Sequence, residues 1–210
     1  AFNKVEVDDY ELPVVGILGE IFVKYHPFSN QQMVEWFTYQ GVEVVLPSLV
    51  GFFTQRFINE EFNQCAYLKR SWKDRAVNQL LSHYVRHYLQ QVDGALLNFR
   101  YYRKNHDLQG LAREASKVAS LANQAGEGWL LIAEMIAMLR NGIRHIICLQ
   151  PFGCLANQIT GKGMERKMKS LYPRLNLLFL DMDAGVSEVN VLNRLQLMLA
   201  SVRNDKKIAA

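Results

Sequence analysis

Four short apolar runs, separated by amphipathic segments, dominate the hydrophobic pattern of this chain. Their length and their glycine, proline or acidic endings are typical of buried strands, predicted at Val14–Leu18, Val42–Leu46, Ile143–Leu149 and Asn176–Leu180. Apolar residues at helical spacing predict helices at Gln31–Tyr39, Trp129–Leu139, Asn157–Leu171 and Ser187–Arg203. Near-continuous apolar strands covered by helices indicate a parallel sheet buried on both faces. We therefore predict an α/β fold, a doubly wound four-stranded parallel sheet of order 2-1-3-4.

Residues 51–125 interrupt this alternation. They contain long helical patterns rich in Leu, Tyr, Arg, Gln and Ala, with breaks expected at Gly94 and at Lys104–Asp107. We predict a large helical insertion over 51–125. It would separate the first βαβ half of the sheet domain, residues 1–50, from the second half, residues 126–210.

Composition narrows the class of protein. The chain has 210 residues, 50% of them hydrophobic and 21% charged, with a net charge of +4, which is typical of a globular domain and does not indicate nucleic-acid binding. No apolar run is long enough to span a membrane, and no signal-peptide pattern opens the chain. Three cysteines are too few for a disulfide scaffold, which favours a cytoplasmic protein. Because the chain starts without methionine, we expect a fragment of a longer protein.

The predicted topology brings three unusual loops to one edge of the sheet. In an open α/β sheet, ligands bind at the carboxyl ends of the strands, where the strand order reverses. Here that crevice lies between the loops Gly19–Asn30 and Gln150–Gln158, and Asp181–Gly185 follows the fourth strand at the same edge. This arrangement makes the crevice the candidate site.

Cys154 is the first candidate residue in that crevice. It lies on the Pro151-Phe152-Gly153 loop and is either a thiolate ligand or reactive thiol, or a small loop residue without a role. Glu20 could act as a base, orient a ligand or be solvated. Asp181 could contact a ligand or belong to the turn. Of the other cysteines, Cys148 is predicted to be core and Cys65 structural.

Other patterns are better explained without a site. His83 and His87 share a helix face, but two histidines do not make a metal site. The basic run Lys69–Lys73 could meet phosphates or an acidic partner, although a solvated helix face is more usual. Gly161-Lys162-Gly163 lacks the remaining residues of a phosphate-binding loop.

Four blocks of the sequence resemble a known family. They are GEIFVKYHPFSN from Gly19, GEGWLLIAEM from Gly126, CLQPFGCLANQITGKG from Cys148 and LDMDAGVSEVNVLNRLQLML from Leu180. In order and spacing they are similar to 2-hydroxyacyl-CoA dehydratase-related proteins, in particular the large CoA-substrate-specific enzyme activases (activators of 2-hydroxyglutaryl-CoA dehydratase). The resemblance covers most of the chain.

The resemblance implies a flavodoxin-like domain that supplies cysteine to an iron–sulfur cluster between domains. ATP hydrolysis in a separate actin-like activase module would drive electron transfer, and acyl-CoA is a possible ligand. The matching cysteine is Cys154; Glu20 and Asp181 fall in matching blocks. The family pattern PFGC-L-P-N-H departs here to Ala156 and Gln158.

Two functions are favoured at this point, and a third, a small-ligand sensor that uses the crevice without metal, stays open beside them. In the first, the chain contributes Cys154 and the crevice loops to an iron–sulfur redox or acyl-CoA site that other domains of the parent complete, because three cysteines cannot hold a cluster alone. In the second, it is a non-catalytic interaction module whose helical insertion docks a dehydratase or the ATPase module. Neither function involves nucleic acid or a membrane.

Overall fold

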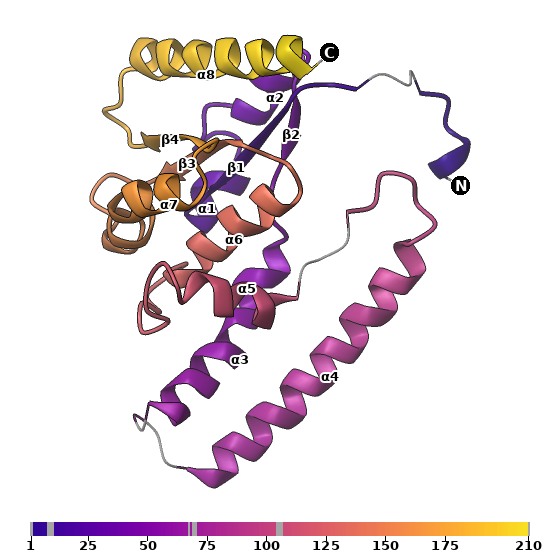
Figure 1. Cartoon of the computed structure of the whole chain (residues 1–210), viewed down its shortest axis with the longest axis vertical. Coiled ribbons are helices and arrows are strands. Elements are labelled where there is room, and N and C mark those ends of the chain that lie inside the picture. Colours follow the sequence, from indigo (N-terminus) through magenta and orange to yellow (C-terminus); the bar gives the residue numbers. More distant parts are fainter. Residues whose placement is uncertain (1, 8–10, 67, 69–70, 104–106, 210) are drawn as a thin grey trace.

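A four-stranded, all-parallel sheet of order β2-β1-β3-β4 forms the centre of the molecule in the computed structural model (Figure 1). The structure describes residues 2–7, 11–66, 68, 71–103 and 107–209. The strands are β1 (Val14–Gly19), β2 (Glu43–Val45), β3 (His145–Gln150) and β4 (Asn176–Asp181). The predicted fold class, strand order and helical insertion are confirmed: this is an α/β fold with the flavodoxin-like 2-1-3-4 order.

The parallel register joins the two halves of the sheet through β1 and β3. Ile17 lies opposite Ile147, and Ile147 lies opposite Leu178 on β4. Every residue of β3 is buried, as expected for a central strand covered on both faces. The second strand, in contrast, is three residues long and half-exposed at the edge of the sheet.

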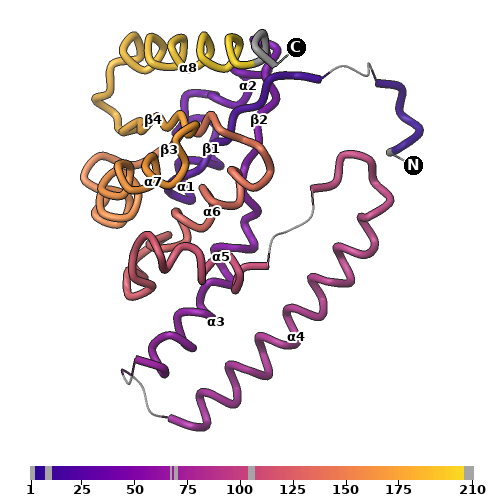
Figure 2. The backbone as a smooth tube through the Cα atoms, in the orientation of Figure 1, coloured from indigo at the N-terminus to yellow at the C-terminus, as the bar shows by residue number. Residues whose placement is uncertain are grey.

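Helices cover both faces of the sheet (Figures 1 and 2). One core cluster gathers residues of α1 (Ile21–Tyr25), α2 (Met33–Tyr39) and α8 (Glu188–Ala209) against β1 and β3. The other gathers residues of α3 (Leu49–Cys65), α5 (Leu108–Ala115), α6 (Trp129–Arg140) and α7 (Glu165–Leu171). Because successive strand residues point to opposite faces, Ile146 joins the second cluster and Ile147 the first.

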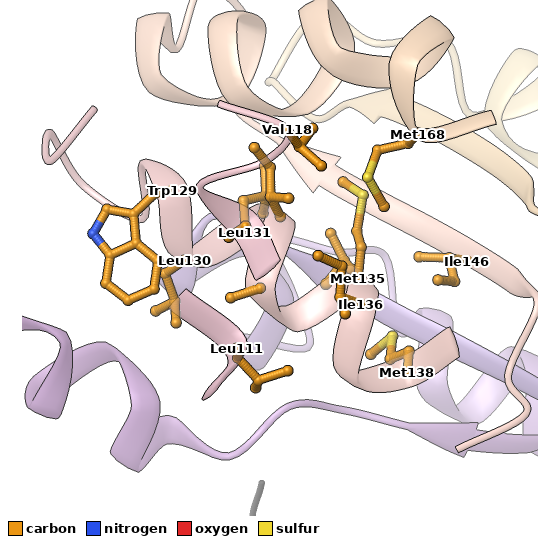
Figure 3. Close-up of a cluster of buried hydrophobic side chains, with 14 of the residues drawn as sticks. Leu111, Val118, Trp129, Leu130, Leu131, Met135, Ile136, Met138, Ile146 and Met168 are labelled. Carbon is orange, nitrogen blue, oxygen red and sulfur yellow. The ribbon is translucent and has the colours of Figure 1, made fainter. Parts of the chain in front are cut away.

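Helix α6 is the centre of the larger core cluster (Figure 3). All its residues from Trp129 to Ile136 are buried, which explains why its sequence is apolar all round rather than on one stripe. The Trp129 indole donates a hydrogen bond of 2.7 Å to Asn59 on α3. On β1, position 16 requires glycine, because a Cβ atom there would lie 2.4 Å from the Met138 sulfur. Helix and sheet therefore pack closely at this point.

The middle of the chain forms α3, α4 (Trp72–Leu96) and α5. Gly94 lies inside α4, so the predicted break there is wrong, because one glycine costs a helix only about 1 kcal/mol. At the other expected break, Lys104 to His106 lie outside the described residues, and Asp107 caps α5 by accepting from the backbone N–H groups of Gln109 and Gly110.

Two further segments differ from the predicted elements. The stretch predicted as one helix at Asn157–Leu171 is a π-helical turn (Asn157–Gly161), a 3₁₀ turn (Lys162–Met164) and then α7. The predicted loop Gly19–Asn30 contains the short helix α1. A 3₁₀ turn at Phe2–Lys4 precedes the sheet. Among the described helices, none combines the length and the apolar character needed to cross a bilayer.

Candidate functional site

The carboxyl edge of the sheet brings the three predicted loops together. β1, β3 and β4 are neighbours in the sheet and end at Gly19, Gln150 and Asp181. Gly19 has a φ of 129°, and a Cβ atom there would lie 1.9 Å from the Leu149 carbonyl oxygen. The next residue, Glu20, donates its backbone N–H to that same oxygen at 2.9 Å. The first loop is thus fixed directly onto β3.

Two carboxylates satisfy the first backbone N–H groups of α1. Glu20 caps the helix by accepting from the Val23 N–H at 2.8 Å, and Glu127 accepts from the Ile21 N–H at 2.8 Å. Glu127 is buried and comes from the loop before α6. The cap gives Glu20 a structural role. Its predicted role in ligand binding stays a prediction.

Cys154 lies in the loop that follows β3, half-buried. The loop turns at Gly153, where φ is 72°, and Cys154 donates its N–H to the Pro151 carbonyl. Its sulfur accepts a hydrogen bond from the Asn157 amide nitrogen at 3.1 Å. Because Asn157 is fully buried, this bond holds the sulfur in one orientation.

The π-helical turn contributes that asparagine. Such turns carry an extra residue in the helix and are frequent at functional sites. The Asn157 Oδ1 atom is buried and has no hydrogen-bond partner among the described residues. Leaving such an atom unpaired costs about 1 to 3 kcal/mol, so its persistence beside a cysteine is unusual. Neither Asn157 nor this turn was identified from sequence, because a single asparagine in a predicted helix carries no signal.

Asp181 is held by three polar side chains. The side-chain amides of Gln150 and Gln158 donate to its Oδ1 atom, and the Lys162 ammonium lies 3.5 Å from Oδ2. Gln150, the last residue of β3, is fully buried, and its Oε1 atom has no partner in the described part of the chain. Gln158 thus serves here as a donor to Asp181. Whether Asp181 also meets a ligand stays a prediction.

A buried ion pair joins α1 to α6, and sequence analysis missed it. Lys24 of α1 contacts both carboxylate oxygens of Glu134 on α6, at 3.1 and 3.0 Å, and both residues are buried. Burial raises the pKa of Glu134 above its ordinary value, and the Lys24 charge opposes that shift. Tyr25 donates to the Pro47 carbonyl, and burial, with Glu134 nearby, raises its pKa to about 12. The pair thus ties α1 to α6.

The three cysteines are in different environments. Cys148 is fully buried on β3, and burial, with a smaller effect from Glu134, raises the pKa of its thiol far above the usual range. Cys65 is exposed at the end of α3. Cys148 thus lies in the core, as predicted, and Cys154 is the cysteine at the carboxyl edge of the sheet.

The ligand set of a metal cluster is incomplete here. Across residues 2–7, 11–66, 68, 71–103 and 107–209, no three His, Cys, Asp or Glu side chains gather where a metal ion could bind. His87, on the surface of α4, bonds to Gln91. A cluster needs about four thiolates or equivalent ligands, so the residues present do not fit an iron–sulfur cluster by themselves.

Comparison of the chain with protein-family models, with curated proteins and with solved structures found no match in any of the three.

Proposed function

We propose that this chain is the α/β domain of a 2-hydroxyacyl-CoA dehydratase-related protein. In this proposal Cys154 and the loops at the carboxyl edge form one wall of an iron–sulfur redox or acyl-CoA site, and other domains of the parent complete it. The observation that carries the proposal is Cys154 at the point where the strand order reverses, its sulfur held by the buried Asn157 amide. The sequence resemblance supplies the chemistry.

The chain's own residues would hold and shape this wall. Gln150, Gln158 and Lys162 fix Asp181 at one side, and Glu20 and Glu127 fix the loop after β1 at the other. Cys154 offers one thiolate ligand between them. All remaining ligands of a cluster would come from outside the described residues, so the domain alone should bind no intact cluster.

The test is to purify the parent protein anaerobically and to measure its iron and sulfide. Cys154→Ser should lower the cluster content strongly, whereas Cys65→Ser, the matched exposed cysteine on α3, should leave it unchanged. Iron and sulfide that stay at wild-type levels in Cys154→Ser would remove this residue as a ligand.

A second function, docking of a partner domain, is supported by a groove between α3 and α4. This α3–α4 groove has a volume of about 970 Å³, and Arg75, His83 and Arg86 of α4 line it. Neither arginine makes an ion pair with a described residue. Glu61 and Asp93 also line the groove, but Arg75 and Arg86, over an apolar floor that includes Ile58 and Leu130, could pair with acidic side chains of an amphipathic helix. That helix would belong to the dehydratase or to the actin-like ATPase module.

Co-purification with each partner distinguishes this second function. Arg75→Glu with Arg86→Glu should abolish binding if the α3–α4 groove docks an acidic helix, and Cys154→Ser should not affect it. Lys167→Glu with Lys169→Glu on α7 is the control for charge. Binding that survives both arginine substitutions would contradict docking in the groove.

A further inference from the structure

Helix α4 presents its most apolar side to solvent. None of its 25 residues, all of them described, is buried. Five apolar side chains recur along it at spacings of three and four residues and are 43 to 57% exposed. These residues, Val77, Leu81, Tyr84, Tyr88 and Val92, are called the α4 stripe below.

The side of α4 that turns toward the rest of the molecule is more polar than the α4 stripe. Its half-buried positions follow the stripe residues by one place each, so they lie about 100° around the helix. They are Asn78, Ser82, Val85, Leu89 and Asp93. A helix normally buries its apolar stripe and exposes its polar face. Helix α4 does the reverse, and Figure 1 shows it standing apart from the sheet, with α3 as its neighbour.

We propose that the α4 stripe binds the α4 stripe of a second copy of this chain, in an antiparallel helix pair. The proposal does not rest on the function proposed above. Apolar side chains at this spacing are the contact residues of paired helices, and contiguous apolar surface of this kind marks an interaction site. The spacing is nearly the same read from either end, so one stripe matches another related by a two-fold axis.

Charge favours a copy of the same chain over a different partner. No charged residue lies on the α4 stripe between Val77 and Val92. Arg86 is the one charged residue of α4 between Arg75 and Asp93, and it lines the α3–α4 groove on another side of the helix. An uncharged stripe meets its own copy without repulsion and carries no pattern that selects a charged partner.

Charge also sets the direction of pairing. Lys73, Asp74 and Arg75 lie in the first turn of α4 and give it a net charge of +1, whereas Asp93 lies near its end. Parallel pairing would place the two basic ends side by side. Antiparallel pairing separates the two first turns, places each near the carboxyl-terminal end of the other helix and opposes the two helix dipoles.

The size of the α4 stripe indicates a reversible dimer. From Val77 to Val92 it is about 22 Å long. Two such stripes alone bury less than the roughly 800 Å² per partner of a standard interface, even with Leu80 and Trp72 beside them. Copies should therefore associate at high protein concentration and separate on dilution.

Sedimentation velocity of the full 210-residue chain, from about 1 µM to about 1 mM, tests the proposal. The mean mass should rise toward twice that of the chain, and Leu81→Glu with Tyr84→Glu should shift the midpoint to at least tenfold higher concentration. Gln79→Glu with Gln90→Glu, which adds the same charge on the groove side of α4, should leave the midpoint unchanged. Circular dichroism checks that each variant is folded.

Crosslinking tests the direction without those variants. In a Cys65→Ser, Cys154→Ser background, a chain with Val77→Cys should crosslink to a chain with Val92→Cys through a short bis-maleimide, and neither should crosslink to itself. The proposal is overturned if the chain stays monomeric over the whole concentration range. It is also overturned if the substitutions in the α4 stripe leave the midpoint of association unchanged. Self-crosslinking of Val77→Cys shows parallel pairing and overturns the antiparallel one.

Discussion

Three cysteines in one chain illustrate how position decides thiol chemistry. Cys65 is exposed, Cys154 is half-buried beside Asn157, and Cys148 is enclosed in the sheet. Thiolate, not thiol, reacts with alkylating reagents, and burial raises the pKa of Cys148 far above the usual range. The environment of each residue therefore predicts a different reactivity.

Alkylation by iodoacetamide at pH 8, read by mass spectrometry, checks this difference. Cys65 and Cys154 should be modified in the folded chain, and Cys148 should be modified at least about a hundredfold more slowly, because modification requires unfolding. In urea all three should react at similar rates. Rapid labelling of Cys148 without denaturant would contradict its burial in the core.

Alanine substitutions at Gly19 and Gly41 distinguish the cost of a steric clash from the cost of backbone strain. Both have positive φ, but a Cβ atom at Gly19 would meet the Leu149 backbone, whereas one at Gly41 would meet nothing within 4 Å. We expect Gly41→Ala to cost about 1 kcal/mol of unfolding free energy, from strain alone, and Gly19→Ala to cost at least about 3 kcal/mol. Urea unfolding of both variants measures this, and equal losses would show that the loop after β1 can move.

The buried Glu134 gives the stability of the fold a dependence on pH. Burial raises its pKa above the ordinary value of 4.5, so the folded state binds this proton more tightly than the unfolded state. The resulting stabilisation is fully present below about pH 4.5 and is lost as pH rises through the raised pKa. Glu134→Gln cannot titrate, so the unfolding free energy of wild type relative to this variant should fall as pH rises from about 4.5.

Urea unfolding of wild type and Glu134→Gln across pH 4 to about 8 provides the comparison. Glu165→Gln, which breaks the partly exposed Glu165–Lys169 pair on α7, is the control and should cost less than about 1 kcal/mol. Profiles for wild type and Glu134→Gln that run parallel would contradict a raised pKa at Glu134.

At the scale of elements, Asn30 connects α1 to α2. It is buried, its amide donates to the carbonyls of Val23 and Lys24, and its Oδ1 atom accepts from the Met33 N–H. Asn30→Ala should cost about 2 to 3 kcal/mol, since three buried groups lose their partner. Ser29→Ala, next to it and half-buried, loses only the hydrogen bond between its hydroxyl and His26 and should cost about 1 kcal/mol. Thermal unfolding of the pair tests whether Asn30 fixes the two helices.

The strands and their order followed from the sequence because each apolar run had one stable place in a buried parallel sheet. Helix α1 could not be predicted, because its five residues depend on contacts to Glu127 and Glu134, which lie 106 and 110 residues further along the chain than their partners Ile21 and Lys24. The same holds for the candidate site. Cys154 and Asp181 were identified by their places after strands, whereas Asn157 and Gln150 act through contacts that no spacing reveals.

At the scale of the molecule, stability should differ between the sheet and the arm formed by α4. β3 is buried throughout, whereas α4 has no buried residue. In the Leu81→Glu, Tyr84→Glu variant, amide hydrogens of α4 should exchange at least about a hundredfold faster than those of β3. Hydrogen-exchange mass spectrometry measures this, and equal protection of the two elements would show that α4 unfolds only with the whole fold.

The position of α4 also affects how this α/β fold can change over evolutionary time. The chain leaves the body through α3 and returns through α5, both of which pack on one another and on α6 (Figure 2). Helix α4 lies outside the packing of α3, α5 and α6. Descendant sequences can therefore lengthen, shorten or lose α4 without rerouting a strand, while the loops at the carboxyl edge of the sheet are inherited intact.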